Sequence, residues 1–242
     1  MLKDMDSYYI FNENGKNKNI DLPKEYGNLG LDEADLSSTI TSDKGIKEVS
    51  MHLAKKLDCV LFLNKYSRIL IDLNRSITNT TLIKNFSHTT KIPGNQNVDD
   101  AEFLKRINEY YRPYRFAIDD KVNEYNNPYI LSLHSFTPHP RFMKNPRKQH
   151  VCVAFVKENE FSKHILTNLE KDENIVIGIN KPFNLSRPDK NGNGVAYVYG
   201  HKGLNSVLFE IKNDLISNDN EQKEWSKKLY DLIPYKVKQL YL

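Results

Sequence analysis

Short apolar runs alternate with stretches of helical spacing along the whole chain. Runs rich in apolar and β-branched residues predict strands over Tyr8–Phe11, Cys59–Leu63, Ile69–Leu73, Tyr129–Ser135, His150–Val156, Ile175–Ile179 and Val207–Ile211. Apolar residues that recur every three or four positions predict helices over about Ile46–Leu57, Asp99–Asn126, Glu158–Leu169 and Glu221–Leu232. Pro113 is expected to kink or divide the second of these helices.

Strands that alternate with helices over the whole length predict an α/β fold. We expect a three-layer sandwich with a mostly parallel or mixed central sheet. No internal repeat and no linker interrupts the pattern, so we expect one domain over residues 1–242. Two polar segments rich in Asn and Pro, Ser76–Val98 and Asn180–Gly194, predict long loops, and loops of this length in compact domains are usually functional.

The composition fits an ordinary globular protein. Of the 242 residues 39% are hydrophobic and 27% are charged, and the formal net charge of +4 is spread along the sequence. This charge points neither to nucleic acid nor to an anionic membrane. The two cysteines, Cys59 and Cys152, lie in apolar runs and are expected to be buried thiols. No apolar window approaches the roughly 18 residues of a membrane span, so we expect a cytoplasmic protein in a reducing compartment.

Polar residues that suit catalysis follow the ends of several predicted strands. In open α/β sheets, ligands bind at the carboxyl ends of the strands. The residues found there are Glu13 and Asn14 after the first strand, Asp72, Asn74 and Arg75 at the end of the third, His134 at the end of another, and Glu210 inside the last. An imidazole, several carboxylates and a guanidinium are the parts of a metal-assisted amide hydrolase, which needs metal ligands, a general base and a carboxylate clamp.

Six segments, in order along nearly the whole chain, resemble the N-formylglutamate amidohydrolase family. The segments are Leu22–Leu36, Tyr66–Arg75, Ile92–Asn95, Tyr111–Tyr114, Leu133–Pro138 and Gly203–Ile216. The resemblance implies a fold related to that of the zinc exopeptidases. It also implies hydrolysis of the N-acyl bond of an amino acid derivative such as N-formylglutamate.

Carried over by position, the resemblance implies a zinc site. His134 matches the His of the family's His-Ser motif and would bind Zn²⁺ through an imidazole nitrogen; the alternative is a polar residue at the end of a strand. Asp43 matches an acidic residue at the start of the first long helix, where it would be a second ligand or an ordinary helix N-cap. Glu13 is a further candidate ligand, and His201 is held in reserve.

The resemblance also assigns substrate contacts and a base. Asn74 and Arg75 match an Asn-Arg pair that binds the substrate's carboxylate, a task that suits a planar guanidinium; alternatively Arg75 pairs with Asp72. Arg68 is a weaker second candidate, for which the alternative is a solvated surface residue. Glu210 matches a Glu that would activate the metal-bound water, and its apolar neighbours are expected to raise its pKa toward the range of a general base.

One expected metal ligand is missing from this sequence. Asn14 stands where the family's first metal-binding His is expected, and an Asn oxygen suits Zn²⁺ less well than an imidazole. Metal affinity is therefore expected to be low.

Three hypotheses follow. The leading one is a metal-dependent hydrolase of a small N-acyl amino acid. The alternative is a metal-free member of the same fold that binds carboxylate ligands. A third and more distant one is RNA binding by the basic stretch Arg141–His150, which could instead steer an anionic substrate or simply be a solvated loop.

Overall fold

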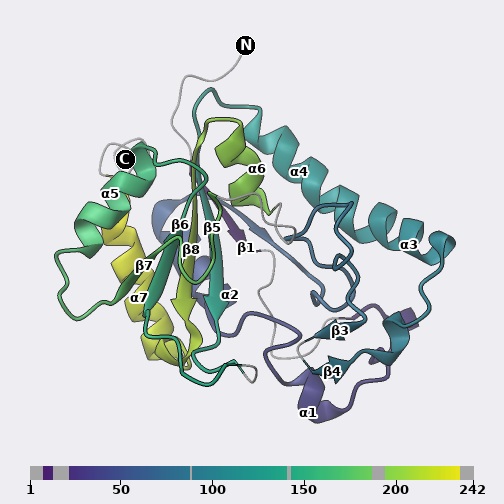
Figure 1. Cartoon of the computed structure of the whole chain (residues 1–242). Coiled ribbons are helices and arrows are strands. Elements are labelled where there is room, and N and C mark those ends of the chain that lie inside the picture. The colour runs from purple at the N-terminus through teal and green to yellow at the C-terminus, as the bar shows by residue number, and fades with distance from the viewer. Residues whose placement is uncertain (1–7, 13–21, 88, 141–142, 187–193, 235–242) are drawn as a thin grey trace.

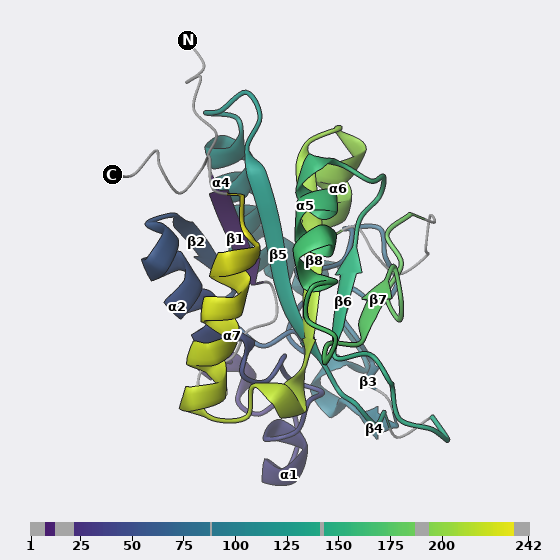
Figure 2. The same ribbon diagram turned by 90° about the vertical axis from the view of Figure 1, so that its left-hand side faces the viewer.

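A six-stranded sheet forms the centre of the protein (Figure 1). The computed structural model describes residues 8–12, 22–87, 89–140, 143–186 and 194–234, so Glu13 and Asn14 lie outside the described residues. The strands of the central sheet are β1 Tyr8–Asn12, β2 Val60–Leu63, β5 Tyr129–Phe136, β6 Val151–Ala154, β7 Ile177–Ile179 and β8 Asn205–Lys212. They lie in the order β2-β1-β5-β8-β6-β7, which Figure 2 shows face on. All neighbours are parallel except β6 and β8, so the sheet is mixed, as predicted.

Helices cover both faces of this sheet. The helices of the described residues are α1 Glu33–Leu36, α2 Ile46–Leu57, α3 Asp100–Arg106, α4 Arg112–Val122, α5 Glu160–Leu169, α6 Val195–His201 and α7 Asp219–Leu232, of which α1 and α3 lie away from the sheet. Helices α2, α5 and α7 pack on one face, and α4 and α6 on the other (Figure 1). The predicted three-layer α/β sandwich is therefore confirmed. Among the described residues, no helix has the length and apolarity needed to cross a membrane.

The two central strands, β5 and β8, divide their side chains between a core and a polar face. Leu131 and Leu133 of β5 belong to the apolar core with α2, α5 and α7. Successive side chains of a strand point to opposite faces, so Ser132 and His134 lie on the other face, toward α6. The same alternation places Glu210 of β8 on that face, because it is the register partner of His134. Strand periodicity thus brings two predicted site residues together.

Pro113 divides the long helix, as predicted. Helix α3 ends at Arg106, a π-helical turn follows over Ile107–Tyr111, and α4 begins at Arg112 with Pro113 in its first turn. Proline lacks the N–H that the helix interior needs, and the first turn is where that loss is tolerated.

The predicted strand Ile69–Leu73 is wrong. This segment is irregular, although its apolar side chains are almost completely buried. Two of its backbone carbonyls accept hydrogen bonds from side chains instead of from a neighbouring strand. Asn95 Nδ2 donates to the Ile69 carbonyl at 2.7 Å, and Arg106 Nη1 donates to the Leu70 carbonyl at 2.9 Å. The buried apolar run is therefore a loop that passes through the core and not a strand.

Two further elements, a hairpin and a helix, were not predicted from the sequence. Within Ser76–Val98, Phe86–Ser87 (β3) and Thr90–Lys91 (β4) form a small antiparallel hairpin. Helix α6 follows Gly194 directly, and its short run of β-branched and aromatic residues has weak intrinsic helix propensity. Packing of Val195 and Tyr199 against β5 and α4 stabilises it.

A buried ion pair holds the loop after the irregular segment. Lys84 Nζ lies 2.6 Å from Asp72 Oδ2, and the Asn74 backbone N–H donates to Asp72 Oδ1 at 3.1 Å. Burial alone would raise the pKa of Asp72, but the positive charges of Lys84, Arg75 and Arg68 lower it to about 2. Burial lowers the pKa of Lys84, and the negative charge of Asp72 opposes this shift.

We predict that this pair makes the free energy of unfolding depend on pH in the acidic range. The folded pKa of Asp72, about 2, lies below the unfolded value of roughly 3.9, so the contribution is complete above about pH 4 and is lost as the pH falls toward 2. Asp72→Asn should lower the free energy of unfolding at pH 7 by about 2–3 kcal/mol, the size implied by the lowered pKa of Asp72, because Lys84 loses the charge of its partner. Urea unfolding should show that the difference in the free energy of unfolding between parent and variant becomes smaller as the pH falls from 4 to 2.

The control is Asp120→Asn, which alters an exposed carboxylate on α4. It should leave the free energy of unfolding within about 0.5 kcal/mol of the parent. If the difference in the free energy of unfolding between parent and Asp72→Asn stays constant down to pH 2, the charge of the Asp72 carboxylate is not the cause of the stabilisation.

Candidate functional site

A cavity of about 470 Å³ opens at the carboxyl ends of β5 and β8. Apart from the reserve candidate His201, its lining contains every predicted site residue that lies among the described residues, namely Asp43, Arg68, Asn74, Arg75, His134 and Glu210. These residues come from the segment before α2, the loops after β2, and the two central strands. The fold therefore brings together residues that are up to 167 positions apart in the sequence.

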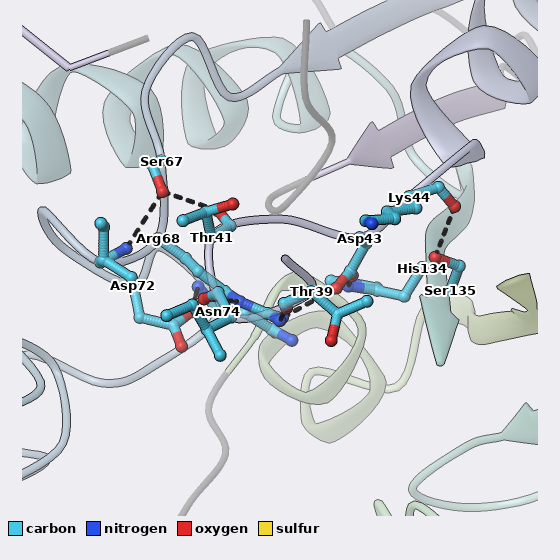
Figure 3. A network of polar contacts seen from close by, with 12 residues as sticks. Thr39, Thr41, Asp43, Lys44, Ser67, Arg68, Asp72, Asn74, His134 and Ser135 are labelled. Carbon is cyan, nitrogen blue, oxygen red and sulfur yellow. Dashed lines mark hydrogen bonds and ion pairs between the residues drawn. The ribbon is translucent and has the colours of Figure 1, made fainter. Parts of the chain in front are cut away.

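Asp43 is the centre of the polar network in this cavity (Figure 3). Its Oδ2 lies 2.8 Å from His134 Nδ1, and its Oδ1 accepts a hydrogen bond from Arg68 Nη1 at 2.7 Å. Asp43 does not cap α2. The N-cap residue of that helix is Gly45, and the helix start has no side-chain capping hydrogen bond. The carboxylate thus joins a cation on one side to an imidazole on the other.

The imidazole of His134 is fixed at both ring nitrogens. Besides the contact of Nδ1 with Asp43, its Nε2 lies 3.3 Å from Ser132 Oγ. The side chain is buried. Hydrogen bonding by a carboxylate orients an imidazole ring and raises its basicity, which suits a metal ligand or a proton carrier.

Glu210 is buried beside His134 on the neighbouring strand. Burial raises the pKa of its carboxyl group to about 8, with Asp43 adding to the rise and His134, Arg147 and Arg68 opposing it. The expected upward shift is therefore found. A pKa in this range allows a carboxyl group to accept and return a proton near neutral pH.

The Arg68 guanidinium is committed to internal partners. Apart from Asp43, it donates from Nε to the Ile40 carbonyl at 3.1 Å and from Nη2 to the Thr39 carbonyl. Arg68 is accordingly not a solvated surface residue. It positions Asp43 and ties the loop after β2 to the segment before α2.

The Asn74–Arg75 pair lies on a turn in the cavity wall. Tyr111 donates its hydroxyl hydrogen to the Arg75 carbonyl at 2.8 Å. Arg75 Nε lies 3.5 Å from Asp72 Oδ2, farther than Lys84 Nζ at 2.6 Å, so Lys84 is the main partner of that carboxylate. The arrangement leaves Arg75 able to contact a ligand in the cavity.

Gly194 is required beside Asn74. A Cβ atom at position 194 would lie 1.6 Å from Asn74 Oδ1, closer than any side chain tolerates. The absence of a side chain at position 194 thus allows the start of α6 to approach the Asn74 amide closely.

Among the described residues, no group of three or more His, Cys, Asp and Glu side chains could hold a metal ion. Asp43 and His134 supply one carboxylate and one imidazole, which are both zinc donors, within 2.8 Å of each other. The described end of β1 lies beside β5, where Phe11 is the register partner of Ser132. Glu13, the remaining candidate ligand, lies outside the described residues.

Sequence reasoning missed two basic residues of the cavity. Lys84 lies in a predicted loop whose sequence has little periodicity, and no local pattern identifies it as a site residue. Arg147 was noted only as one charge of a basic stretch, although it lines the cavity. His201, by contrast, is exposed on α6, contacts Tyr197 with 4.3 Å between the centroids of the tilted rings, and does not line the cavity.

Comparison with solved structures agrees with the fold. A gene product of Agrobacterium tumefaciens is similar with a TM-score of 0.84 and 24% sequence identity, over 98% of this chain and 92% of its own. An N-formylglutamate amidohydrolase from Ralstonia eutropha is similar with a TM-score of 0.72 and 16% identity, over 95% of this chain and 92% of its own. At these identities the likeness shows the fold alone. No curated protein matches the chain significantly.

Comparison of the sequence with protein families is more specific. The sequence model of the N-formylglutamate amidohydrolase family matches residues 19–217, which are most of the chain and include every described candidate site residue. The chain therefore belongs to the N-formylglutamate amidohydrolase family, a family of hydrolases that act on amide bonds.

Proposed function

We propose that the protein hydrolyses the N-acyl amide bond of a small N-acyl amino acid such as N-formylglutamate, in a metal-dependent reaction. The observation that carries the proposal is the single cavity lined by the Asp43–His134 pair, by Glu210 and by the Asn74–Arg75 pair. These groups supply metal donors, a base and a carboxylate clamp at one place. Membership of the family supports the amide as the bond that is cleaved.

Asn74 and Arg75 would bind the α-carboxylate of the substrate. A guanidinium donates two parallel hydrogen bonds to a carboxylate, and the Asn74 amide adds a further donor. The Tyr111 hydroxyl already holds the backbone of Arg75, so the loop needs little rearrangement when the substrate binds.

Glu210 would act as the general base and then as the acid. It takes a proton from water as the water oxygen attacks the acyl carbon, and it returns that proton to the amide nitrogen as the carbon–nitrogen bond breaks. The products are a carboxylic acid, formate for a formyl group, and the free amino acid. The raised pKa of Glu210 suits both halves of this cycle.

His134, Asp43 and Glu13 are the residues that would hold Zn²⁺. An imidazole with two carboxylates is a donor set that zinc accepts in catalytic sites. When bound, the ion would supply Lewis-acid polarisation and a more acidic water. The task of Arg68 is then to hold the Asp43 carboxylate, through the contact of 2.7 Å.

A second candidate function is carboxylate binding without a metal. One observation favours it: the Asp43 carboxylate is already neutralised by Arg68 and already in contact with His134. A carboxylate that is satisfied in this way needs no metal ion. Asn14, in place of the expected His, points in the same direction.

We predict that Glu210→Gln lowers kcat for N-formylglutamate hydrolysis by at least about a hundredfold, because the amide cannot accept the proton from water. Release of formate is the measurement. Glu224→Gln, which changes an exposed carboxylate on α7, is the matched control and should retain the parent rate. Unchanged turnover in a folded Glu210→Gln protein would remove Glu210 from the reaction.

We also predict the response to zinc. The proposed enzyme takes up one equivalent of Zn²⁺ in calorimetric titration, and a chelator abolishes formate release. Glu13→Gln should weaken zinc binding more than about tenfold, since loss of an outer-shell partner alone costs roughly 10–100-fold, and Asn14→His should strengthen it. Formate release that persists after complete removal of metal would contradict metal dependence. Binding of N-formylglutamate without zinc uptake or hydrolysis would favour the carboxylate-binding protein.

A further inference from the structure

One part of the cavity lining is apolar. The side chains of Phe183, Leu185, Ala196 and Leu208 line the cavity and pack in one apolar cluster, which we call the apolar wall. Ala196 and Leu208 are buried, and Phe183 and Leu185 are partly buried. None of these four side chains carries a hydrogen-bonding group, so the apolar wall offers nothing to the carboxylate or the amide of a substrate. The proposed reaction uses none of them.

The apolar wall begins directly beside Glu210. Leu208 and Glu210 lie two positions apart on β8, so their side chains point to the same face of the sheet, roughly 7 Å from each other along the strand. The register partner of Leu208 on β5 is Ser132, just as that of Glu210 is His134. The apolar wall therefore adjoins the place where the amide bond is proposed to be cleaved.

The aromatic end of the apolar wall and the Asn74–Arg75 pair come from opposite edges of the sheet. The pair follows β2, one edge strand, whereas Phe183 and Leu185 follow β7, the other edge strand, and Glu210 lies between them on β8. The guanidinium of Arg147, whose charge acts on Glu210, lies 5.2 Å from the centroid of the Phe183 ring. The reacting centre thus has the carboxylate clamp toward one edge of the sheet and the apolar wall toward the other.

Backbone contacts outside the cavity hold the apolar wall in shape. The Ala196 carbonyl accepts a hydrogen bond from Ser206 Oγ at 3.1 Å, which connects α6 to β8. The backbone N–H of Leu185 donates to Asn180 Oδ1 at 3.2 Å, and the same oxygen accepts the N–H of Phe155, directly after β6, at 3.2 Å. A preformed apolar surface binds an apolar group with little loss of conformational freedom.

We propose that the apolar wall binds the acyl chain of the substrate, so that the protein prefers N-acyl amino acids with an apolar acyl chain longer than formyl or acetyl. This assignment rests on the proposed function, in which the Asn74–Arg75 pair binds the α-carboxylate and Glu210 acts at the acyl carbon. In an N-acyl amino acid, the α-carboxylate and the acyl chain lie on opposite sides of the amide bond. A substrate held by the clamp therefore directs its acyl chain toward the apolar wall.

The size of the cavity supports a longer chain. A formyl group ends at its carbonyl carbon and does not reach from Glu210 to Leu208, whereas a chain of several methylene groups spans this distance. The volume of about 470 Å³ lies in the range of pockets that hold drug-sized ligands, roughly 300–1,000 Å³. N-formylglutamate is much smaller than such ligands and would leave the apolar wall uncovered.

The test measures kcat/KM for the release of glutamate from N-acetyl-, N-butanoyl- and N-hexanoylglutamate, with zinc supplied. The three amides have nearly the same intrinsic reactivity, so a difference in kcat/KM reports how the chain binds. The parent should show a kcat/KM for N-hexanoylglutamate at least about tenfold above that for N-acetylglutamate, because each fully buried methylene is worth roughly fourfold. A kcat/KM that stays constant or falls as the chain lengthens overturns the proposal.

Ala196→Leu tests whether the apolar wall causes this preference. The larger side chain occupies the space of the acyl chain and should reduce the ratio of kcat/KM between the hexanoyl and acetyl compounds to less than about fourfold, the worth of one buried methylene. Ala117→Leu is the matched control, because it adds the same atoms at an exposed position of α4 outside the cavity lining and should keep the parent's ratio. A parental ratio in Ala196→Leu would mean that the chain binds elsewhere, and the proposal would be wrong.

The series of acyl chains in the parent keeps the proposal testable if Ala196→Leu does not fold. A parent that hydrolyses none of the three compounds contradicts the proposed function. Their dissociation constants, measured by calorimetry, then decide the case of the apolar wall. Binding of N-hexanoylglutamate at least about tenfold tighter than that of N-acetylglutamate supports the assignment, and equal binding refutes it.

Discussion

The double contact of the Asp43 carboxylate is the interaction on which the cavity depends. One oxygen binds Arg68 and the other binds His134, so a single side chain connects the segment before α2, the loop after β2 and the end of β5 (Figure 3). All three groups are largely removed from water, and removal of one partner from a buried ion pair costs about 3–5 kcal/mol. The network therefore fixes the position of the imidazole relative to Glu210 on the neighbouring strand.

Local charge distinguishes this cavity from the rest of the chain. The overall net charge of +4 indicates no partner. Within the described lining, however, the side chains of Arg68, Arg75, Lys84 and Arg147 face only three carboxyl groups, those of Asp43, Asp72 and Glu210. Burial keeps Glu210 partly protonated near neutral pH, which increases the positive excess. A cavity of this kind attracts small anions, as the proposed substrates are.

Sequence patterns predicted the parts of the fold that depend on local periodicity. The alternation in β5 and β8 and the apolar spacing of α2 located three elements, and through them His134, Glu210 and Asp43. The segment Ile69–Leu73 was mistaken for a strand because its burial depends on Asn95 and Arg106, which donate to its carbonyls from 26 and 36 positions away. Periodicity carries no information about such tertiary contacts.

The same limit explains the residues of the cavity that were missed. Arg147 is one of several basic residues in its stretch, and only the folded chain places it beside Phe136 and Phe183 in the cavity lining. Resemblance to a family supplied the roles of Asn74 and Arg75, whereas the structure supplied what holds them, including the close approach of Gly194. The most direct test of the account is the rate of formate release from N-formylglutamate by Asp43→Asn, supplied with zinc and verified as folded. The account predicts a kcat/KM at least about tenfold below that of the parent, because Asp43 is a proposed ligand and loss even of an outer-shell partner of a ligand costs that much; a kcat/KM equal to that of the parent would contradict it.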